Sequence, residues 1–231
     1  MFYKIPDNFL SELDELEGFI TAFQQGTLDE AALKARRVPF GCYEQREEGT
    51  YMLRIRTPGG AVTPQQLRTI ARISKEQNGP FVHVTTRQEF QLHDIKLENV
   101  VGVMRQLAAA GLSTRGGGGN TVRNILLSAD AGIAPDEVFD PGPYVFSLTS
   151  RLIAQGDSWV LPRKFKISFS NSDTDTAHAK FNDLGFIASV KDGKKGFRVY
   201  VAGGLGAKSE QGHLFHDFIP LEDVYQTTEA V

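Results

Sequence analysis

The spacing of apolar residues divides the chain into a helical start and a later region of mixed period. Residues 7–25 and 28–36 carry apolar side chains at helical intervals, with Asp or Thr near their starts, so two short helices are expected there. After residue 50 the apolar and polar positions alternate. This alternation predicts strands at residues 51–56, 81–86 and 89–95.

Two further helices are predicted around these strands. One covers residues 63–79, opened by Thr63 with Pro64 at its first position and closed by Gly79, and the other covers residues 97–111. The order strand, helix, strand, strand, helix indicates a small α+β unit whose helices cover one face of an antiparallel sheet.

A glycine-rich stretch, STRGGGGN at residues 113–120, interrupts the pattern. Four consecutive glycines cannot form a regular element at tolerable entropy, so a flexible loop and a domain boundary after residue 115 are predicted. Beyond it we expect a short apolar segment, a helix and three strands, at residues 121–128, 142–156, 164–170, 185–190 and 196–204. Residues 219–231 begin an amphipathic helix that stops early, so the chain is expected to be a fragment of a longer protein.

Composition narrows the class of protein. The chain has 231 residues, of which 41% are hydrophobic, and no run approaches the roughly 18 to 20 apolar residues that cross a bilayer. The acidic N-terminal segment differs from a secretory signal, so a soluble, cytoplasmic protein is predicted. The one cysteine, Cys42, can form no internal disulfide and cannot by itself hold zinc or an iron–sulfur cluster, so no metal ligands are assigned.

The net charge of −3 conceals a basic central region. Residues 1–50 carry 5 basic and 10 acidic groups, residues 51–128 carry 10 and 4, and residues 129–231 carry 10 and 14. Several of the central cations lie in predicted strands, where a solvated helix face does not explain them. This pattern predicts a surface that binds an anion, with nucleic acid, phosphate and polycarboxylate all left open.

Two pairs of cations follow strand periodicity. Arg54 and Arg56 of LRIRTPGG are expected on one side of a strand, as are Lys164 and Lys166 of LPRKFKIS. Paired like charges favour a bound anion between them. The alternatives are a solvated sheet face for the arginines and an edge strand protected by lysine for the second pair.

The segment TTRQEFQLHDI gathers polar groups around a turn and a strand. Arg87 and Gln88 precede the strand, and Gln91 and His93 share one of its faces. These groups are candidates for ligand contacts, although a solvent-facing edge explains the same pattern. His93 is a candidate metal ligand or acid, but the other histidines show no ligand spacing with it.

Glycine-rich segments flank two further candidates. In GGGGNTVRN, Arg123 and Asn124 follow the glycines, but the GxxxxGK[ST] pattern of a nucleotide-binding loop is missing. In VAGGLG, Gly204 lies where the backbone can either approach a flat ligand or form a turn.

Taken in order, LRIRTPGG, TTRQEFQLHDI, GNTVRN, LPRKFKIS and VAGGLG resemble the N-terminal half of the sirohaem-dependent nitrite and sulfite reductases, over residues 41–231. The resemblance implies an N-terminal helical arm at 1–40, a ferredoxin-like half-domain at 41–115 and part of a sirohaem and iron–sulfur domain at 116–231. It also implies that nitrite or sulfite undergoes six-electron reduction in the full-length enzyme, while this fragment alone is inactive.

The same resemblance assigns roles to the candidate residues. Arg56, Arg123, Lys164 and Lys166 would hold the substrate anion and help deliver protons. The expected cofactor contacts, which face a tetrapyrrole with eight carboxylates, are Arg54, Arg87, Gln88, Gln91, His93, Asn124 and Gly204. The implied partners are an electron donor, either ferredoxin or a flavoprotein, and the C-terminal half of the same protein.

Two departures from the family pattern keep alternatives open. The Cys-rich signature that supplies the [4Fe–4S] ligands is not in this sequence, and ILLSADAG follows NTVRN where the family usually continues toward a Cys- or Pro-containing turn. One alternative is a diverged structural copy of the module. The other is a basic ferredoxin-like domain that binds nucleic acid, which the absence of an RNP-like G-F-x-F pattern disfavours, so neither nucleic acid nor membrane is expected as a partner.

Overall fold

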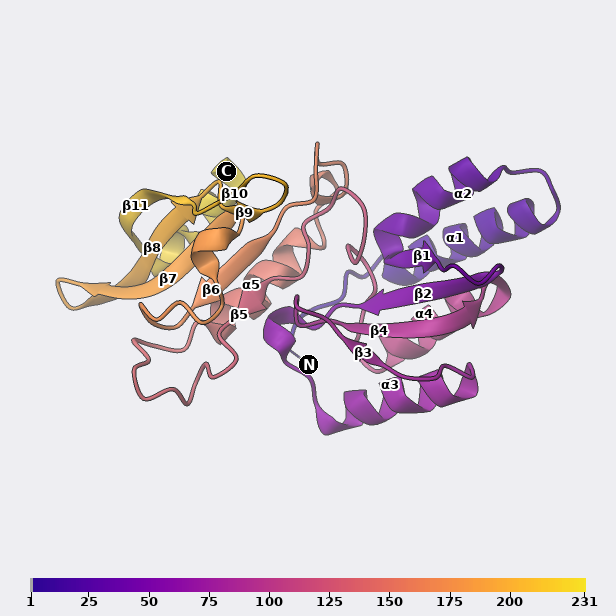
Figure 1. Cartoon of the computed structure of the whole chain (residues 1–231), viewed down its shortest axis with the longest axis horizontal. Helices are drawn as coiled ribbons and strands as arrows, with labels where there is room; N and C mark the ends of the chain where they lie inside the picture. The colour runs from indigo at the N-terminus through magenta and orange to yellow at the C-terminus, as the bar shows by residue number, and fades with distance from the viewer. Residues whose placement is uncertain (1) are drawn as a thin grey trace. The chain divides into compact units, whose positions relative to one another are not determined.

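The computed structural model describes residues 2–231, which form two compact units (Figure 1). Of the described residues, unit 1 comprises 2–57, 61–123 and 150–164, and unit 2 comprises 58–60, 124–149 and 165–231. Each unit is described by itself.

Unit 1 is built from a sheet and four α-helices. Its strands are β1 (Cys42–Glu44), β2 (Thr50–Ile55), β3 (His83–Val84) and β4 (Phe90–Lys96). Its helices are α1 (Phe9–Gln24), α2 (Glu30–Arg37), α3 (Pro64–Glu76) and α4 (Val100–Ala109). The first helix of the basic region starts as predicted, because Thr63 and Gln66 form a reciprocal capping box with Pro64 at the first helical position.

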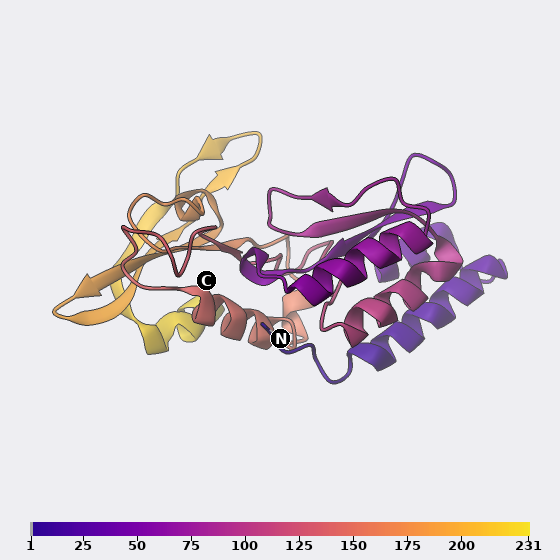
Figure 2. The same ribbon diagram turned by 90° about the horizontal axis from the view of Figure 1, so that it is seen from below.

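The strands of unit 1 lie in the order β1-β2-β4-β3, and every neighbouring pair is antiparallel. Figure 2 shows the indigo α1, the purple α3 and the pink α4 together on one side of these strands. Their apolar faces meet Leu53, Ile55 and Leu92 of the sheet in one buried core. The predicted α+β arrangement, with helices on one face of an antiparallel sheet, is therefore confirmed.

Two strand predictions in unit 1 need correction. The strand expected at 81–86 is only the two-residue β3, whose exposed position at the sheet edge supplies little packing. The short strand β1 was not predicted, because three residues are too few to show an alternating pattern.

Unit 2 contains a larger, mixed sheet. Its strands are β5 (Leu126–Leu127), β6 (Ile167–Ser170), β7 (Leu184–Lys191), β8 (Lys194–Val201) and β11 (His213–Pro220), in the order β11-β8-β7-β6-β5. The remaining elements are the hairpin of β9 (Gly204–Leu205) and β10 (Ser209–Glu210), helix α6 (Val224–Ala230) and helix α5 (Gly142–Leu152), whose last three residues are counted with unit 1. Strands β5, β6 and β7 are parallel, whereas β8 and β11 are antiparallel to their neighbours.

Aromatic rings fill the core of unit 2. The rings of Phe169 and Phe186 stack with centroids 4.4 Å apart, and Phe197 meets both edge-on from β8. These residues are fully buried, so each contributes a large apolar area to the stability of the sheet.

The structure also changes two predicted boundaries in unit 2 and adds one strand. Strand β6 begins at Ile167 and not at Lys164, because Lys164 is exposed and only residues from 167 onward enter the sheet continuously. Strand β11 runs through Pro220, so the last helix starts at Val224 and not at residue 219. Strand β11 escaped prediction because its polar and apolar positions do not alternate regularly, and its pairing with β8 shifts register twice. Among residues 2–231, no helix is long and apolar enough to cross a membrane.

Candidate anion-binding site

The cationic residues of β2 project from the face of the sheet opposite the core. In the ladder between β2 and β4, Arg54 lies opposite Gln91 and Ile55 lies opposite Phe90. Directly opposed residues of an antiparallel pair point to the same side, so Gln91 shares the face of Arg54 and, two residues on, of Arg56. Continuing this register brings Glu89 opposite Arg56. The sequence prediction that the two arginines share a face agrees with this arrangement.

Arg56 is fully buried and grips two backbone carbonyls. Its Nε donates to the carbonyl oxygen of Arg115 at 3.0 Å, and its Nη2 donates to that of Val122 at 2.7 Å. Its Nη1 is buried and finds no hydrogen-bond acceptor within the described part of the chain. Burial lowers the pKa of Arg56 to about 10, although the negative charge of Glu89 opposes that shift. Arg56 therefore links the two ends of the glycine segment through its hydrogen bonds, and one of its N–H groups has no acceptor.

The glycine segment packs tightly, in contrast to the flexible loop predicted. Gly116, Gly117 and Gly118 are buried. A Cβ atom on Gly116, whose φ is +71°, would lie 2.4 Å from Nη2 of Arg56, and one on Gly118 would lie 2.2 Å from the carbonyl oxygen of Val38. These glycines are needed because other backbone and the Arg56 guanidinium approach too closely for any side chain.

Two more arginines extend the cationic face. Arg123, also buried, donates from Nη2 to the carbonyl oxygen of Gly117 at 2.7 Å, and burial lowers its pKa. Arg54 is about one-fifth exposed and lies over the ring of Tyr43, with 5.9 Å from its Cζ to the ring centroid. The Nε atoms of both arginines are buried without an acceptor among residues 2–231.

Glu89 is the one carboxylate in contact with these cations that the structure describes. Its side chain is fully buried, and its Oε2 lies 3.6 Å from Nη1 of Arg54, too long for a hydrogen bond. Burial raises its pKa, and Arg54, Arg56 and Arg123 pull it back down. Glu89 is not among the predicted site residues, although it alternates with Gln91 and His93 in the sequence, which was a usable signal.

The turn before β4 holds Glu89 in position. The hydroxyl Oγ1 of Thr85 accepts hydrogen bonds from the backbone N–H groups of Arg87 and Glu89, each at 3.2 Å. Gln88 adopts a left-handed φ of +54°, and its carbonyl oxygen accepts a bond from the Thr57 hydroxyl at 2.5 Å. The turn is thereby tied to the end of β2, which places Arg87 and Gln88 beside the arginine face.

His93, in the middle of β4, belongs to a separate aromatic group. Its Nδ1 lies 3.3 Å from the side-chain nitrogen of Gln45, and its ring packs against Phe81 and stacks with His83 at 6.4 Å between centroids. Burial lowers its pKa, so the neutral ring is favoured. Within the described residues, no group of His, Cys, Asp or Glu is arranged to hold a metal ion.

The remaining predicted site residues fall on both units. Lys164 is exposed at the end of unit 1, while Lys166 is half-buried in unit 2 and its backbone N–H donates to Asp183 at 2.8 Å. Asn124 is buried in unit 2, and Gly204 starts β9 with open space around it. The structure thus brings Arg54, Arg56 and Arg123 together within unit 1. The joint anion site of all four predicted catalytic cations stays a prediction.

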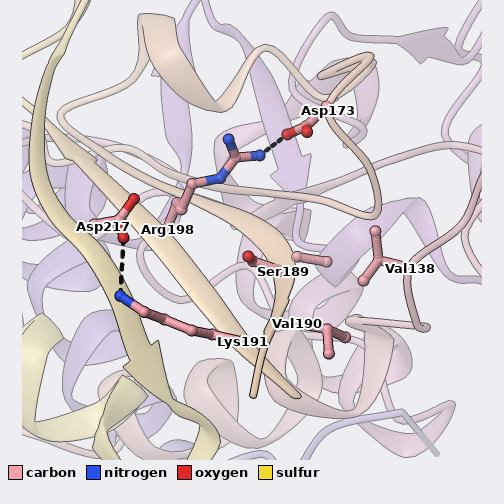
Figure 3. A pocket seen from close by; sticks show the side chains of 8 residues that line it. Val138, Asp173, Ser189, Val190, Lys191, Arg198 and Asp217 are labelled. Atoms are coloured by element: carbon pink, nitrogen blue, oxygen red, sulfur yellow. Dashed lines mark hydrogen bonds and ion pairs between the residues drawn. The ribbon is translucent and has the colours of Figure 1, made fainter. Parts of the chain in front are cut away.

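The two units differ in the size of their cavities. Beside Arg56, unit 1 has a small cavity of about 10 Å³, which is at the lower limit for a single water molecule. Unit 2 has an open pocket of about 520 Å³ along β7 and β8, shown in Figure 3. The charges that line this pocket are paired, because Lys191 binds Asp217 at 3.1 Å and Arg198 binds Asp173.

Unit 1 is an antiparallel sheet with helices on one face and buried arginines on the other, and unit 2 is built on a mixed five-stranded sheet, so the chain is a two-part α+β protein. Comparison with known proteins specifies the family. Residues 43–110 match the nitrite/sulfite reductase ferredoxin-like half domain, and residues 118–231 match the nitrite and sulphite reductase 4Fe-4S domain. The chain belongs to the nitrite and sulfite reductase family.

Individual relatives agree with this assignment. A ferredoxin–nitrite reductase of Leptolyngbya laminosa is 34% identical over 80% of the chain and 37% of its own length. A sulfite reductase [ferredoxin] of Mycobacterium tuberculosis is 32% identical over 99% of the chain and 44% of its own length. The solved structure of the Mycobacterium tuberculosis NirA protein superposes with a TM-score of 0.81 at 29% identity, covering 98% of the chain and 46% of that protein. The chain thus spans less than half the length of these relatives.

The cofactors of this family are sirohaem and a [4Fe–4S] cluster, and the two groups fit this chain differently. The spare guanidinium N–H groups of Arg54, Arg56 and Arg123 are suited to carboxylates, which sirohaem carries. The cluster does not fit, because Cys42 is the only cysteine in the sequence, is fully buried in the core, and has its pKa raised to about 12 by that burial.

Proposed function

We propose that this chain is the N-terminal part of a sirohaem- and [4Fe–4S]-dependent enzyme that reduces nitrite or sulfite by six electrons, with ferredoxin as the favoured electron donor. In this proposal the chain supplies the cationic face that binds anions, and the C-terminal half of the same protein supplies the cluster ligands. The nitrite and sulfite reductases among the relatives support both substrates, and several of these relatives are named as ferredoxin-dependent enzymes.

The observation that carries the proposal is a surplus of buried cationic donors in unit 1. Nε of Arg54, Nη1 of Arg56 and Nε of Arg123 are buried, and no acceptor for them occurs among the residues described. Native proteins satisfy nearly all buried donors, so this concentration of spare donors indicates a ligand with several anionic oxygens.

When bound, sirohaem would supply the iron that holds the substrate and the redox chemistry. In this proposal the carboxylates of sirohaem are held by Arg54, Arg87, Gln88 and Gln91, with His93, Asn124 and Gly204 as further predicted contacts. Arg123, Lys164 and Lys166 would attract the substrate anion and stabilise negative charge that develops as an N–O or S–O bond breaks.

A second role is favoured for Arg56. Two of its three nitrogen groups already donate to backbone carbonyls, and it is fully buried. This arrangement supports a structural role in closing the glycine segment and weighs against direct contact with the substrate. The diverged structural copy suggested by sequence would give all the cations such a role.

The deciding experiment substitutes the cations in the full-length protein that carries this chain. Arg123→Ala and Lys164→Ala are expected to lower turnover of nitrite or sulfite by about 10²- to 10³-fold, because each removes a donor to developing charge. Turnover should be measured with reduced ferredoxin and with a chemical reductant, so that a defect in donor docking is separated from a defect in reduction. The circular dichroism spectrum should stay that of the wild type.

Lys191→Ala is the matched control, because it removes a lysine whose partner, Asp217, is also on the surface. We expect it to turn over substrate at the wild-type rate. Normal reduction of both nitrite and sulfite by the Arg123 and Lys164 variants would overturn the assignment of roles.

A further inference from the structure

The arginine cluster of unit 1 contains an acid that none of the proposed roles uses. Glu89 lies among Arg54, Arg56 and Arg123, and both of its carboxylate oxygens are buried without a hydrogen-bond donor in the described chain. The three arginines each retain a buried nitrogen in the same condition. Unmatched donors and unmatched acceptors therefore coexist in one cluster.

This coexistence shows that Glu89 balances the charge of the arginines without completing their hydrogen bonds. The shortest recorded approach, 3.6 Å to Nη1 of Arg54, makes an ion pair but no hydrogen bond. The guanidinium groups are instead fixed on backbone carbonyls, as for Arg123 on Gly117 and Arg56 on Arg115 and Val122. These bonds to the backbone fix the positions of the guanidinium groups, and their spare N–H groups remain available to a ligand.

A bound oxyanion would satisfy the unmatched donors of the arginines but would repel the carboxylate of Glu89. Its oxygens would accept from Nε of Arg54 and Nε of Arg123, which removes the surplus of donors. The same oxyanion would then stand near an ionised carboxylate, and two anions in one buried site repel each other. Protonation of the carboxylate removes that repulsion and converts Glu89 from an acceptor into a donor.

We propose that Glu89 is the internal counter-ion and proton acceptor of the cluster: it balances the arginines while no ligand is bound, takes up one proton from solvent when an oxyanion binds Arg54 and Arg123, and then donates a hydrogen bond to that anion. Only the identity of the anion, nitrite or sulfite, rests on the proposed function. The proton joins a carboxylate oxygen and returns to solvent when the anion leaves, so nothing else is consumed.

The charges around Glu89 set the direction of this exchange. The titratable and charged groups that face the cluster come from the N-terminal segment, the strands β1 and β2 with the residue after β2, the turn before β4 and both flanks of the glycines: Tyr3, Tyr43, Arg54, Arg56, Arg87, Arg115 and Arg123. All of the partners that act on Glu89 itself are arginines, and burial nevertheless raises its pKa. An added anion cancels part of their effect, so it moves the pKa of Glu89 further upward. Arg54, about one-fifth exposed, gives solvent a route to the site.

The test measures the protonation of Glu89 directly in the 231-residue chain, with nitrite as the probe. Nitrite stays a monoanion over the pH range of the experiment, so it adds no titration of its own. The side-chain carboxyl ¹³C signal of Glu89, identified by its loss in Glu89→Gln, is followed against pH with and without nitrite. We expect nitrite to raise the midpoint by at least about one pH unit, which corresponds to about a tenfold gain in affinity on protonation.

Calorimetry in buffers with different heats of ionisation gives a second, independent readout. At a pH between the two midpoints, the wild-type chain should take up close to one proton for each nitrite bound. Glu89→Gln mimics the protonated acid, so it should show no uptake and should bind nitrite about tenfold more tightly than the wild type at alkaline pH. If Glu89→Gln fails to fold, the wild-type proton uptake still decides the question.

Two variants complete the experiment. Glu98→Gln makes the same chemical change at an exposed position and should leave affinity and proton uptake at wild-type values. Arg123→Ala should abolish nitrite binding, which locates the probe. A Glu89 midpoint unmoved by bound nitrite, or failure of the wild-type chain to bind nitrite, would overturn the proposal.

The outcome separates this inference from the proposed function. Loss of turnover in the full-length Arg123 and Lys164 variants, together with an unmoved Glu89 midpoint, would leave the reductase role standing and remove the role of Glu89. Proton uptake at Glu89 together with normal turnover in those variants would support the role of Glu89 and remove the proposed catalytic roles of Arg123 and Lys164.

Discussion

The charged pocket of unit 2 and the arginine cluster of unit 1 differ in how their positive charges are balanced. In the pocket of unit 2, each cation meets a surface carboxylate, as Lys191 meets Asp217 and Arg198 meets Asp173 (Figure 3). In unit 1, three arginines share one buried carboxylate, Glu89, and keep donors in reserve. Nε of Arg198 also has no acceptor among the described residues, so the two regions differ in the number of counter-ions and not in spare donors alone. Each cation of the unit 2 pocket lies beside its own carboxylate, whereas three arginines of unit 1 share one and leave positive charge for an anionic ligand. The difference explains why a large open pocket is the weaker candidate for the site.

The largest expected effect comes from removing a buried arginine. Arg56→Ala leaves Glu89 with less compensating charge and the carbonyls of Arg115 and Val122 without their donor. We expect the free energy of unfolding to fall by about 3–5 kcal/mol, as for other broken buried charge networks. Urea unfolding followed by circular dichroism measures it.

Arg198→Ala is the comparison from unit 2. Arg198 is about one-quarter exposed and its partner Asp173 is mostly exposed, so we expect a loss below about 1 kcal/mol. Equal losses for the two variants would show that the two regions do not differ in the way described. Arg56→Lys, which keeps the charge but not the geometry, should fall between wild type and Arg56→Ala.

A smaller effect is expected in the pH dependence of stability. Because the pKa of Glu89 in the folded chain lies above its ordinary value of 4.5, its contribution to stability is greatest below that value. The contribution is lost as pH rises through the raised pKa. Glu89→Gln should therefore remove part of the decline in unfolding free energy with pH, measured by urea unfolding at several pH values. A parallel decline in wild type and variant would contradict the raised pKa.

The smallest effect is expected at the surface pair of unit 2. Lys191→Ala and Asp217→Asn each break one exposed ion pair, with side chains 55% and 70% exposed. The change should stay within about 0.5 kcal/mol and shrink further at high salt. A thermal unfolding series at two salt concentrations would measure it, and a loss as large as that of Arg56→Ala would remove the contrast between the regions.

Sequence patterns predicted the regular parts of the fold because local forces determine them. The capping box of Thr63 and Gln66 and the alternation around Arg54 and Arg56 are local features, and the structure has both. The glycine segment was misjudged because its order comes from Val38 and Arg56, which lie far away in sequence. No local pattern reports such a contact.

The candidate site could be predicted in part for the same reason. Alternation placed Arg54 and Gln91 on one face, and Glu89 could have been added by the same rule. Its burial and its lack of hydrogen-bond partners follow from the packed loop above the sheet, which only the three-dimensional structure shows. The family resemblance was confirmed, while the role of each site residue stays a prediction.

The N-terminal segment and helix α1 determine where a shortened form of this protein can begin. The ferredoxin-like match begins at Tyr43, yet the hydroxyl of Tyr3 accepts the backbone N–H of Ser113, and Glu12 binds Arg115 at 2.6 Å. A protein that began at Tyr43 would leave the Arg115 guanidinium without Glu12 and the Ser113 N–H without its acceptor, and it would loosen the strand end that carries Arg56. The residues that a stable fold needs therefore begin earlier in the chain than the residues that match the family.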